Sequence, residues 1–172
     1  MHERIMGVLV CCLAVLIAVR AEAADATFGA DYATAYIFRG QTLSNRSVVQ
    51  PYLEVIPEKF PLTLGVWGNF GLADDTRGYA KRGEFSEVDL YASYAWPLGL
   101  DWLSMSVGYN EYTYPSGDVD ADREAAIKAA LNGFFLTPEL GVYPGLGGSY
   151  AGACYLEASL SREQELYKEL IG

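Results

Sequence analysis

EFSEVDLYASYAW, residues 84–96, alternates between two kinds of side chain. One set is apolar or aromatic: Val88, Leu90, Ala92, Tyr94 and Trp96. The intervening set is polar apart from one tyrosine: Glu87, Asp89, Tyr91 and Ser93. Successive side chains of a β-strand point to opposite faces, so this period of two predicts a strand with one apolar and one polar face.

The same alternation recurs along most of the sequence. It is clear in residues 27–39, 48–56, 62–70 and 103–114. We also expect strands at 124–132, 138–144 and 149–161, although the first of these is rich in good helix formers. Residues 161–172 favour a helical or frayed end.

The breaks between these segments alternate between short and long. PEKFP (57–61) and PLGLD (97–101) are short, whereas GLADDTRGYAKRG (71–83) and PSGDVDADR (115–123) are long and polar. A meander of transmembrane strands has tight turns on one rim and long loops on the other. The strands are also long enough to cross a bilayer at a tilt, which takes about 9–11 residues.

Residues 1–23 read as a secretory signal peptide, with a basic start, a short apolar stretch and a small-x-small end. Its removal takes away two acidic and two basic residues, so the net charge stays at −10, which argues against nucleic acid as a partner. It also removes His2, the only histidine, and leaves Cys154 alone. Histidine-dependent catalysis and an intramolecular disulfide are therefore excluded, and we expect neither an enzyme nor a cofactor.

The alternation makes physical sense if the apolar faces meet lipid and the polar faces line an enclosed aqueous lumen. The predicted aromatic girdle consists of Tyr32, Tyr36, Phe38, Tyr94, Trp96, Trp102 and Tyr109. The lumen or constriction candidates are Asp31, Arg39, Glu54, Glu87, Asp89, Lys128 and Glu157. Two interpretations stay open: a charged constriction that favours cations, or an ion-pair network that fills a narrow barrel.

Several segments resemble one family: YIFRGQTLSNRSVVQPYLEV (36–55), GVWGNF (65–70), GEFSEVDLYASYAWPL (83–98) and LSMSVGYNEYTYP (103–115). They are similar to the TorF-type porins, uncharacterised outer-membrane β-barrels of Gram-negative bacteria. The resemblance implies an outer-membrane barrel with a channel role and carries over no substrate or catalytic residues. Family members are usually longer and end in a strand with a terminal aromatic residue, whereas this sequence ends YKELIG. The expectation is a barrel of about eight strands or a truncated larger one.

We therefore predict an all-β, antiparallel up-and-down transmembrane β-barrel over residues 24–172, located in the outer membrane. Its partners would be lipid, lipopolysaccharide and the barrel-assembly machinery, with the oligomeric state left open. The predicted function is passive diffusion of small hydrophilic solutes or ions. The alternative is a non-conducting structural or adhesive barrel that acts through its loops at 71–83 and 114–123.

Two other interpretations of the residues compete with this prediction. A secreted soluble β-sandwich or filled soluble barrel would also show period-two strands, but its loops need not sort by length. DVDADRE (118–124) imitates the start of a calcium-binding loop, yet Arg123 replaces the required glycine and Ala129 the bidentate glutamate. We therefore expect an ordinary acidic loop and no metal site.

Overall fold

The structure is a computed structural model that describes residues 24–117 and 119–163. The predicted signal peptide, residues 1–23, lies outside the described residues, as does the predicted helical end from residue 164 onward. No α-helix occurs within the described residues, and none of their helical segments is long and apolar enough to cross a membrane.

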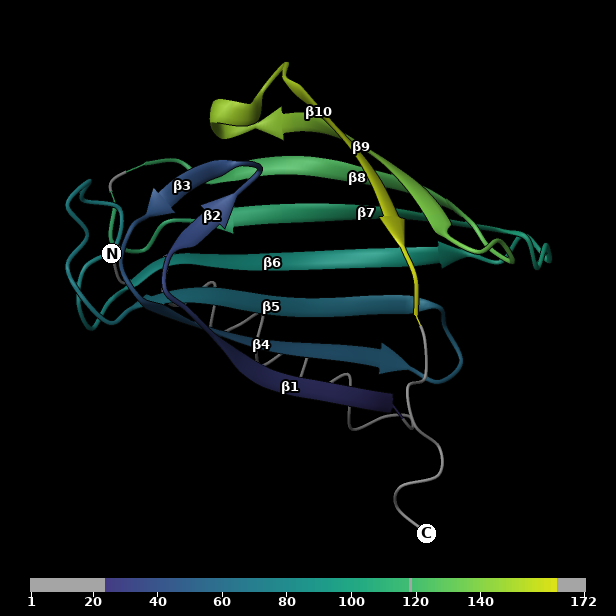
Figure 1. Cartoon of the computed structure of the whole chain (residues 1–172), viewed down its shortest axis with the longest axis horizontal. Coiled ribbons are helices and arrows are strands. Elements are labelled where there is room, and N and C mark those ends of the chain that lie inside the picture. Colours follow the sequence, from purple (N-terminus) through teal and green to yellow (C-terminus); the bar gives the residue numbers. More distant parts are fainter. Residues whose placement is uncertain (1–23, 118, 164–172) are drawn as a thin grey trace, which may run out of the picture.

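Eight strands form one antiparallel sheet in which strands adjacent in sequence are neighbours in the sheet, apart from a small hairpin inserted after the first strand (Figure 1). The strands, in sheet order, are β1 (Ala24–Ala33), β4 (Val48–Pro57), β5 (Leu62–Gly71), β6 (Phe85–Trp96), β7 (Leu103–Thr113), β8 (Asp122–Leu131), β9 (Thr137–Gly147) and β10 (Cys154–Ser161). The all-β antiparallel prediction is confirmed, including the strand at 124–132. The sheet is curved (Figure 1), but among the described residues no hydrogen-bonded ladder joins β1 to β10, so its two edges are not paired.

The two long loops that the sequence predicts lie at one rim of the sheet, and the predicted short turns lie at the other. Residues 58–61, 97–102 and 132–136 form turns at one rim of the sheet. At the opposite rim lie the longer loop 72–84, the loop 114–121, and a segment that includes the short 3-10 turn η1 (Gly148–Tyr150). We call these the short-turn rim and the long-loop rim.

The two faces of the sheet differ in polarity. On the convex outer face, large apolar side chains stand in the open: Leu140 is 63% exposed and Leu156 is 70% exposed. The almost fully buried side chains are instead mostly polar, and Asn69, Glu87 and Glu124 are all at or below 2% exposure. Charged and amide side chains are therefore buried on the concave side, whereas leucines of the convex side stay exposed.

The segment 27–39 is not the single strand that its alternation predicted. Strand β1 ends at Ala33, the backbone bends, and β2 (Tyr36–Phe38) pairs with β3 (Gln41–Ser44) in a separate hairpin on the concave side of the sheet. Tyr36 is only 7% exposed, and its ring lies 5.5 Å from that of Trp67 on β5.

The predicted outward position is therefore wrong for Tyr36, and also for Phe38, whose ring packs against that of Tyr112 on the concave side. The physical reason is that aromatic rings on the wall, from Trp67 and Tyr112, offer the hairpin apolar surface inside the sheet. The remaining aromatic candidates keep outward or exposed positions: Tyr32, Tyr94, Trp96, Trp102 and Tyr109.

Candidate functional site

One register row runs around the concave face across five strands. Glu54 pairs with Gly65, Gly65 with Tyr91, Tyr91 with Asn110, and Asn110 with Glu124. Because directly paired residues of neighbouring strands share a face, these side chains all point into the same interior. The row brings together groups from residues 54 to 124 at one level of the sheet.

A missing side chain on β5 sets the orientation of Tyr91. A Cβ placed on Gly65 would lie 2.0 Å from the Tyr91 ring, so this ring lies flat over the glycine backbone. The Tyr91 hydroxyl donates a hydrogen bond of 2.8 Å to Oε1 of Glu54. The Tyr91 ring therefore lies along the wall of the sheet and leaves the interior space in front of the wall free.

Arg39, at the tip of the β2–β3 hairpin, reaches from the concave side to the wall. Its Nη2 atom lies 2.7 Å from Oε1 of Glu124, whose side chain is 1% exposed. The same oxygen accepts hydrogen bonds from the Tyr112 hydroxyl at 2.7 Å and from Nδ2 of Asn110 at 3.1 Å. A buried carboxylate held by three donors is a fixed anchor for a cation.

Aromatic rings surround the same guanidinium. The Arg39 Cζ atom lies 4.1 Å from the ring centre of Tyr155, 4.8 Å from that of Phe38 and 5.1 Å from that of Tyr143. The ring of Tyr150, on η1, is 5.7 Å away. All four distances fall within the roughly 6 Å over which a cation is attracted to a ring face. We call Phe38, Tyr143, Tyr150, Tyr155 and Glu124 the Arg39 cage.

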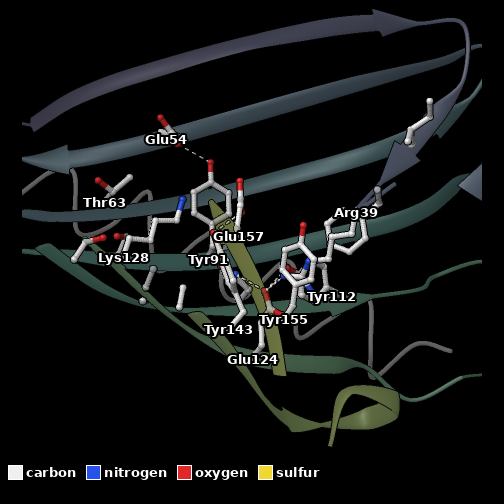
Figure 2. A pocket seen from close by; sticks show the side chains of 18 residues that line it. Arg39, Glu54, Thr63, Tyr91, Tyr112, Glu124, Lys128, Tyr143, Tyr155 and Glu157 are labelled. Atoms are coloured by element: carbon white, nitrogen blue, oxygen red, sulfur yellow. Dashed lines mark hydrogen bonds and ion pairs between the residues drawn. The ribbon is translucent and has the colours of Figure 1, made fainter. Parts of the chain in front are cut away.

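Two cavities meet at this cage. One, of about 620 Å³, extends toward the short-turn rim and is lined by Thr63, Lys128 and Glu157 (Figure 2). The other, of about 950 Å³, extends toward the long-loop rim and is lined by Tyr79 and Glu87. Four members of the cage, together with Arg39 itself, line both cavities: Phe38, Glu124, Tyr143 and Tyr155. Arg39 therefore stands between two polar compartments that lie in series.

A second polar cluster lies above the cage, on the side of the long-loop rim. Glu87 is 2% exposed and accepts a hydrogen bond from the hydroxyl of Tyr79, a residue of the loop 72–84. Burial and the neighbouring Glu87 carboxylate raise the pKa of the Tyr79 phenol far above its ordinary value, so this hydroxyl stays a donor. The Oδ1 atom of nearby Asp89 is buried and has no hydrogen-bond partner within the described residues.

The structure brings together most of the predicted lumen residues. Six lie on the concave face: Arg39, Glu54, Glu87, Asp89, Lys128 and Glu157. Lys128 lies 3.8 Å from Glu139, and Glu157 accepts a hydrogen bond of 3.0 Å from Tyr143. Asp31, on the edge strand β1, pairs with Gln50 of β4. It is exposed and lines neither cavity.

Sequence reasoning missed six residues that build the cage and its support. These are Asn110, Tyr112, Glu124, Tyr143, Tyr150 and Tyr155. A signal was present for Glu124 and Tyr155, because they share the polar face with Lys128 and Glu157, respectively, at even spacing along their strands. What the sequence lacked was the hairpin that carries Arg39 to them. Among the described residues there is no group of three or more side chains arranged to hold a metal ion.

The comparison with protein families gives one match, over residues 20–153. The matching family is described as "Bacterial protein of unknown function (Gcw_chp)". The protein belongs to this family. The Gcw_chp match spans β1 to β9, and so includes Arg39, Glu124 and Tyr143, while β10 with Tyr155 lies beyond it. Neither the curated proteins nor the solved structures include a match to this sequence.

Proposed function

We propose that the protein is a porin-like barrel of the outer membrane that allows passive diffusion of small hydrophilic solutes or ions. The observation that carries this proposal is the reversed polarity of the sheet, with exposed leucines outside and a carboxylate such as Glu124 almost fully buried inside. An apolar outer band next to lipid and a polar bore are the two requirements of a transmembrane barrel. Lipid and lipopolysaccharide are then the partners of the outer face.

The interior supports a passage for hydrophilic solutes. The two cavities, about 620 Å³ and 950 Å³, are in series along the strand direction, and both are lined mainly by polar and aromatic side chains. Carboxylates outnumber cations on these walls. The cations are Arg39 and Lys128, and the carboxylates are Glu54, Glu87, Asp120, Asp122, Glu124 and Glu157. An excess of negative charge along a bore favours cations.

Conductance of refolded protein in planar bilayers tests this proposal. We expect steady current steps with a preference for K⁺ over Cl⁻. Migration of unboiled and boiled samples on a gel serves as the control for folding, because a folded membrane barrel shifts between the two. A barrel that shows this shift and gives no current steps would contradict the proposal.

The second candidate is a non-conducting barrel that acts through its long loops. The observation in its favour is that the loop 72–84 has an internal framework, because Asp75 is buried and accepts hydrogen bonds from the backbone N–H groups of Asn45, Arg77 and Tyr79. A loop with one fixed shape suits recognition of a partner. A folded barrel without current whose binding to cells or matrix is lost in Asp75→Ala would support this candidate.

A further inference from the structure

The Arg39 cage is built to hold a cation, and most of it belongs to the wall. Tyr143 and Tyr155 come from β9 and β10, Tyr150 from η1 and Glu124 from β8, whereas only Phe38 belongs to the hairpin. Arg39 thus enters a site whose anionic group and three of four rings are supplied by residues 124–155, far from it in sequence.

The wall part of the cage has contacts that do not involve Arg39. Tyr143 donates to Glu157 and lies 5.8 Å from the Tyr155 ring, and Glu124 is held by Asn110 and Tyr112. These contacts hold Tyr143, Tyr155 and the Glu124 carboxylate through partners other than Arg39. A site whose groups are held by their own contacts binds a ligand with less loss of conformational freedom, which favours affinity.

Arg39, which occupies the cage, has a backbone conformation that non-glycine residues rarely adopt. Arg39 has a φ of 49° and is followed by Gly40 with a φ of 76°, so the hairpin tip is left-handed at both residues. This turn directs the Arg39 side chain into the cage, at the place where the two cavities meet. The arrangement is that of a tethered ligand in an aromatic site.

We propose that the Arg39 cage is a binding site for an organic cation of the guanidinium or alkylammonium class, which Arg39 occupies as a tethered substitute. The four rings and Glu124 supply the two interactions that such cations need, ring faces and one buried carboxylate. A solute in either cavity reaches the site, because both cavities are lined by its members. As a statement about the transported solute, this inference rests on the proposed pore; the site itself can be measured without it.

The test is binding of ethylguanidinium to refolded protein in detergent micelles, read as the rise in the midpoint of thermal unfolding. Arg39→Ala empties the cage, so we expect a saturable rise at millimolar ethylguanidinium. Wild-type protein must first release its tethered arginine, whose effective concentration is itself millimolar or higher, so its response should need at least about tenfold more ligand. Ethylurea, the neutral isostere, and NaCl at equal ionic strength should cause no such rise.

Matched variants locate the site. In the Arg39→Ala background, Tyr155→Leu removes the nearest ring and should weaken binding roughly three- to thirtyfold. Tyr32→Leu removes an exposed tyrosine of β1 outside the cage and should leave binding unchanged. An Arg39→Ala protein that folds and responds equally to ethylguanidinium, ethylurea and NaCl would overturn the proposal.

A second variant is used if Arg39→Ala does not refold. Arg39→Gln keeps most of the side-chain volume without the charge, and it is titrated with the same solutes. If neither refolds, refolding in millimolar ethylguanidinium against ethylurea decides: rescue by the cation supports the site, and no rescue overturns it. Binding without current would retain the site and contradict the pore, and current without binding would do the reverse.

Discussion

The Arg39 guanidinium contacts the Glu124 carboxylate at 2.7 Å across a sequence separation of 85 residues. This contact joins the tip of an inner hairpin to β8, which is separated from the β10 edge of the sheet by β9. Glu124 is almost fully buried, and its Oε1 atom is held by Arg39 and by the two neutral donors Asn110 and Tyr112. The pair is therefore a long-range electrostatic tie between the hairpin and the wall.

Removal of one partner of this pair should destabilise the fold. In Glu124→Ala, Arg39 keeps its charge inside the aromatic rings without a carboxylate, and we expect a loss of about 3 kcal/mol in the free energy of unfolding. Glu124→Gln retains an acceptor and should cost less, about 2 kcal/mol. The matched control is Glu139→Gln, which breaks the half-exposed pair with Lys128 and should cost less than about 1 kcal/mol. Urea titration of the refolded protein measures all three, and equal losses in Glu124→Ala and Glu139→Gln would contradict the prediction.

The glycine beneath Tyr91 should not tolerate a side chain. In Gly65→Val, the new Cβ meets the Tyr91 ring at 2.0 Å and forces it off the wall, which also breaks its hydrogen bond to Glu54. We expect a loss of about 2 kcal/mol or more in the free energy of unfolding. Gly117→Ala, in a loop where the nearest atom lies at 3.5 Å, is the control and should be close to neutral. A Gly65→Val protein as stable as this control would show that the ring position is not constrained.

The loop 72–84 should lose its framework at low pH. Burial acts to raise the pKa of Asp75, but three backbone N–H donors, from Asn45, Tyr79 and Arg77, outweigh it and hold the pKa below its usual range. A carboxyl with a lowered folded pKa contributes stability that is present above its unfolded pKa and is lost as the pH falls through the folded one. The loss should begin near pH ~4, where an unfolded aspartate titrates, and continue below it.

The measurement is the free energy of unfolding at pH values of about 7 and about 3, above and below the aspartate range, for wild type and Asp75→Asn. Wild type should lose more stability on acidification than the variant, which has no charge to titrate at this position. Asp74→Asn is the control, since Asp74 accepts a single backbone hydrogen bond in this loop, from the exposed Arg82. An identical pH dependence in wild type and Asp75→Asn would refute the proposed role of the Asp75 charge.

The strands of the sheet were predictable because each one repeats a simple rule. In β6, Val88 and Leu90 alternate with Glu87 and Asp89 without interruption, and the structure keeps that alternation as two faces. Even the alanine-rich β8 follows it, since alternation at residues 124–132 outweighed helix propensity. Pairing with β7 and β9 on both sides explains this, because tertiary contacts override a propensity difference of a few tenths of a kcal/mol per residue.

The hairpin was not predictable by the same rule. Alternation continues unbroken from Tyr32 through Tyr36 to Phe38, and no glycine or proline marks the bend after Ala33. Periodicity states which side chains share a face, but it does not state where a strand leaves one sheet for another. The turn itself is marked only by Gly40, because the left-handed Arg39 before it carries no sequence signal. The cage was missed for that reason, although Glu124 and Tyr155 lie on faces that the sequence predicts to be polar. The strand expected at 149–161 begins only at Cys154, so Tyr150 lies on η1 instead.

Removal of the Arg39 charge should change ion selectivity. Under the proposed function, Arg39→Ala eliminates a cation from the boundary between the two cavities and leaves Glu124 and Glu157 nearby. We expect larger single-channel conductance and a higher permeability ratio of K⁺ to Cl⁻. Arg82→Ala, which removes an exposed charge from the long loop, should change the ratio much less. An unchanged ratio in a folded Arg39→Ala barrel would place the ion path away from this residue.

The orientation of the sheet can be tested with single cysteines on β10. In a background with Cys11, Cys12 and Cys154 replaced by serine, Leu156→Cys and Glu157→Cys place thiols on opposite faces of one strand. After insertion into liposomes, a water-soluble methanethiosulfonate should label Glu157→Cys, and only a lipid-soluble maleimide should label Leu156→Cys.

The control for the labelling experiment, and the result that would contradict the prediction, both depend on how exposed each position is to water. Arg82→Cys, in the exposed loop, should react with the water-soluble reagent in every preparation. Leu156 is 70% exposed in the absence of lipid, so a water-soluble sheet would leave the thiol of Leu156→Cys fully reactive toward the same reagent. Rapid aqueous labelling of Leu156→Cys in the liposome fraction would therefore rule out a lipid-facing outer surface, and with it the proposed barrel in the membrane.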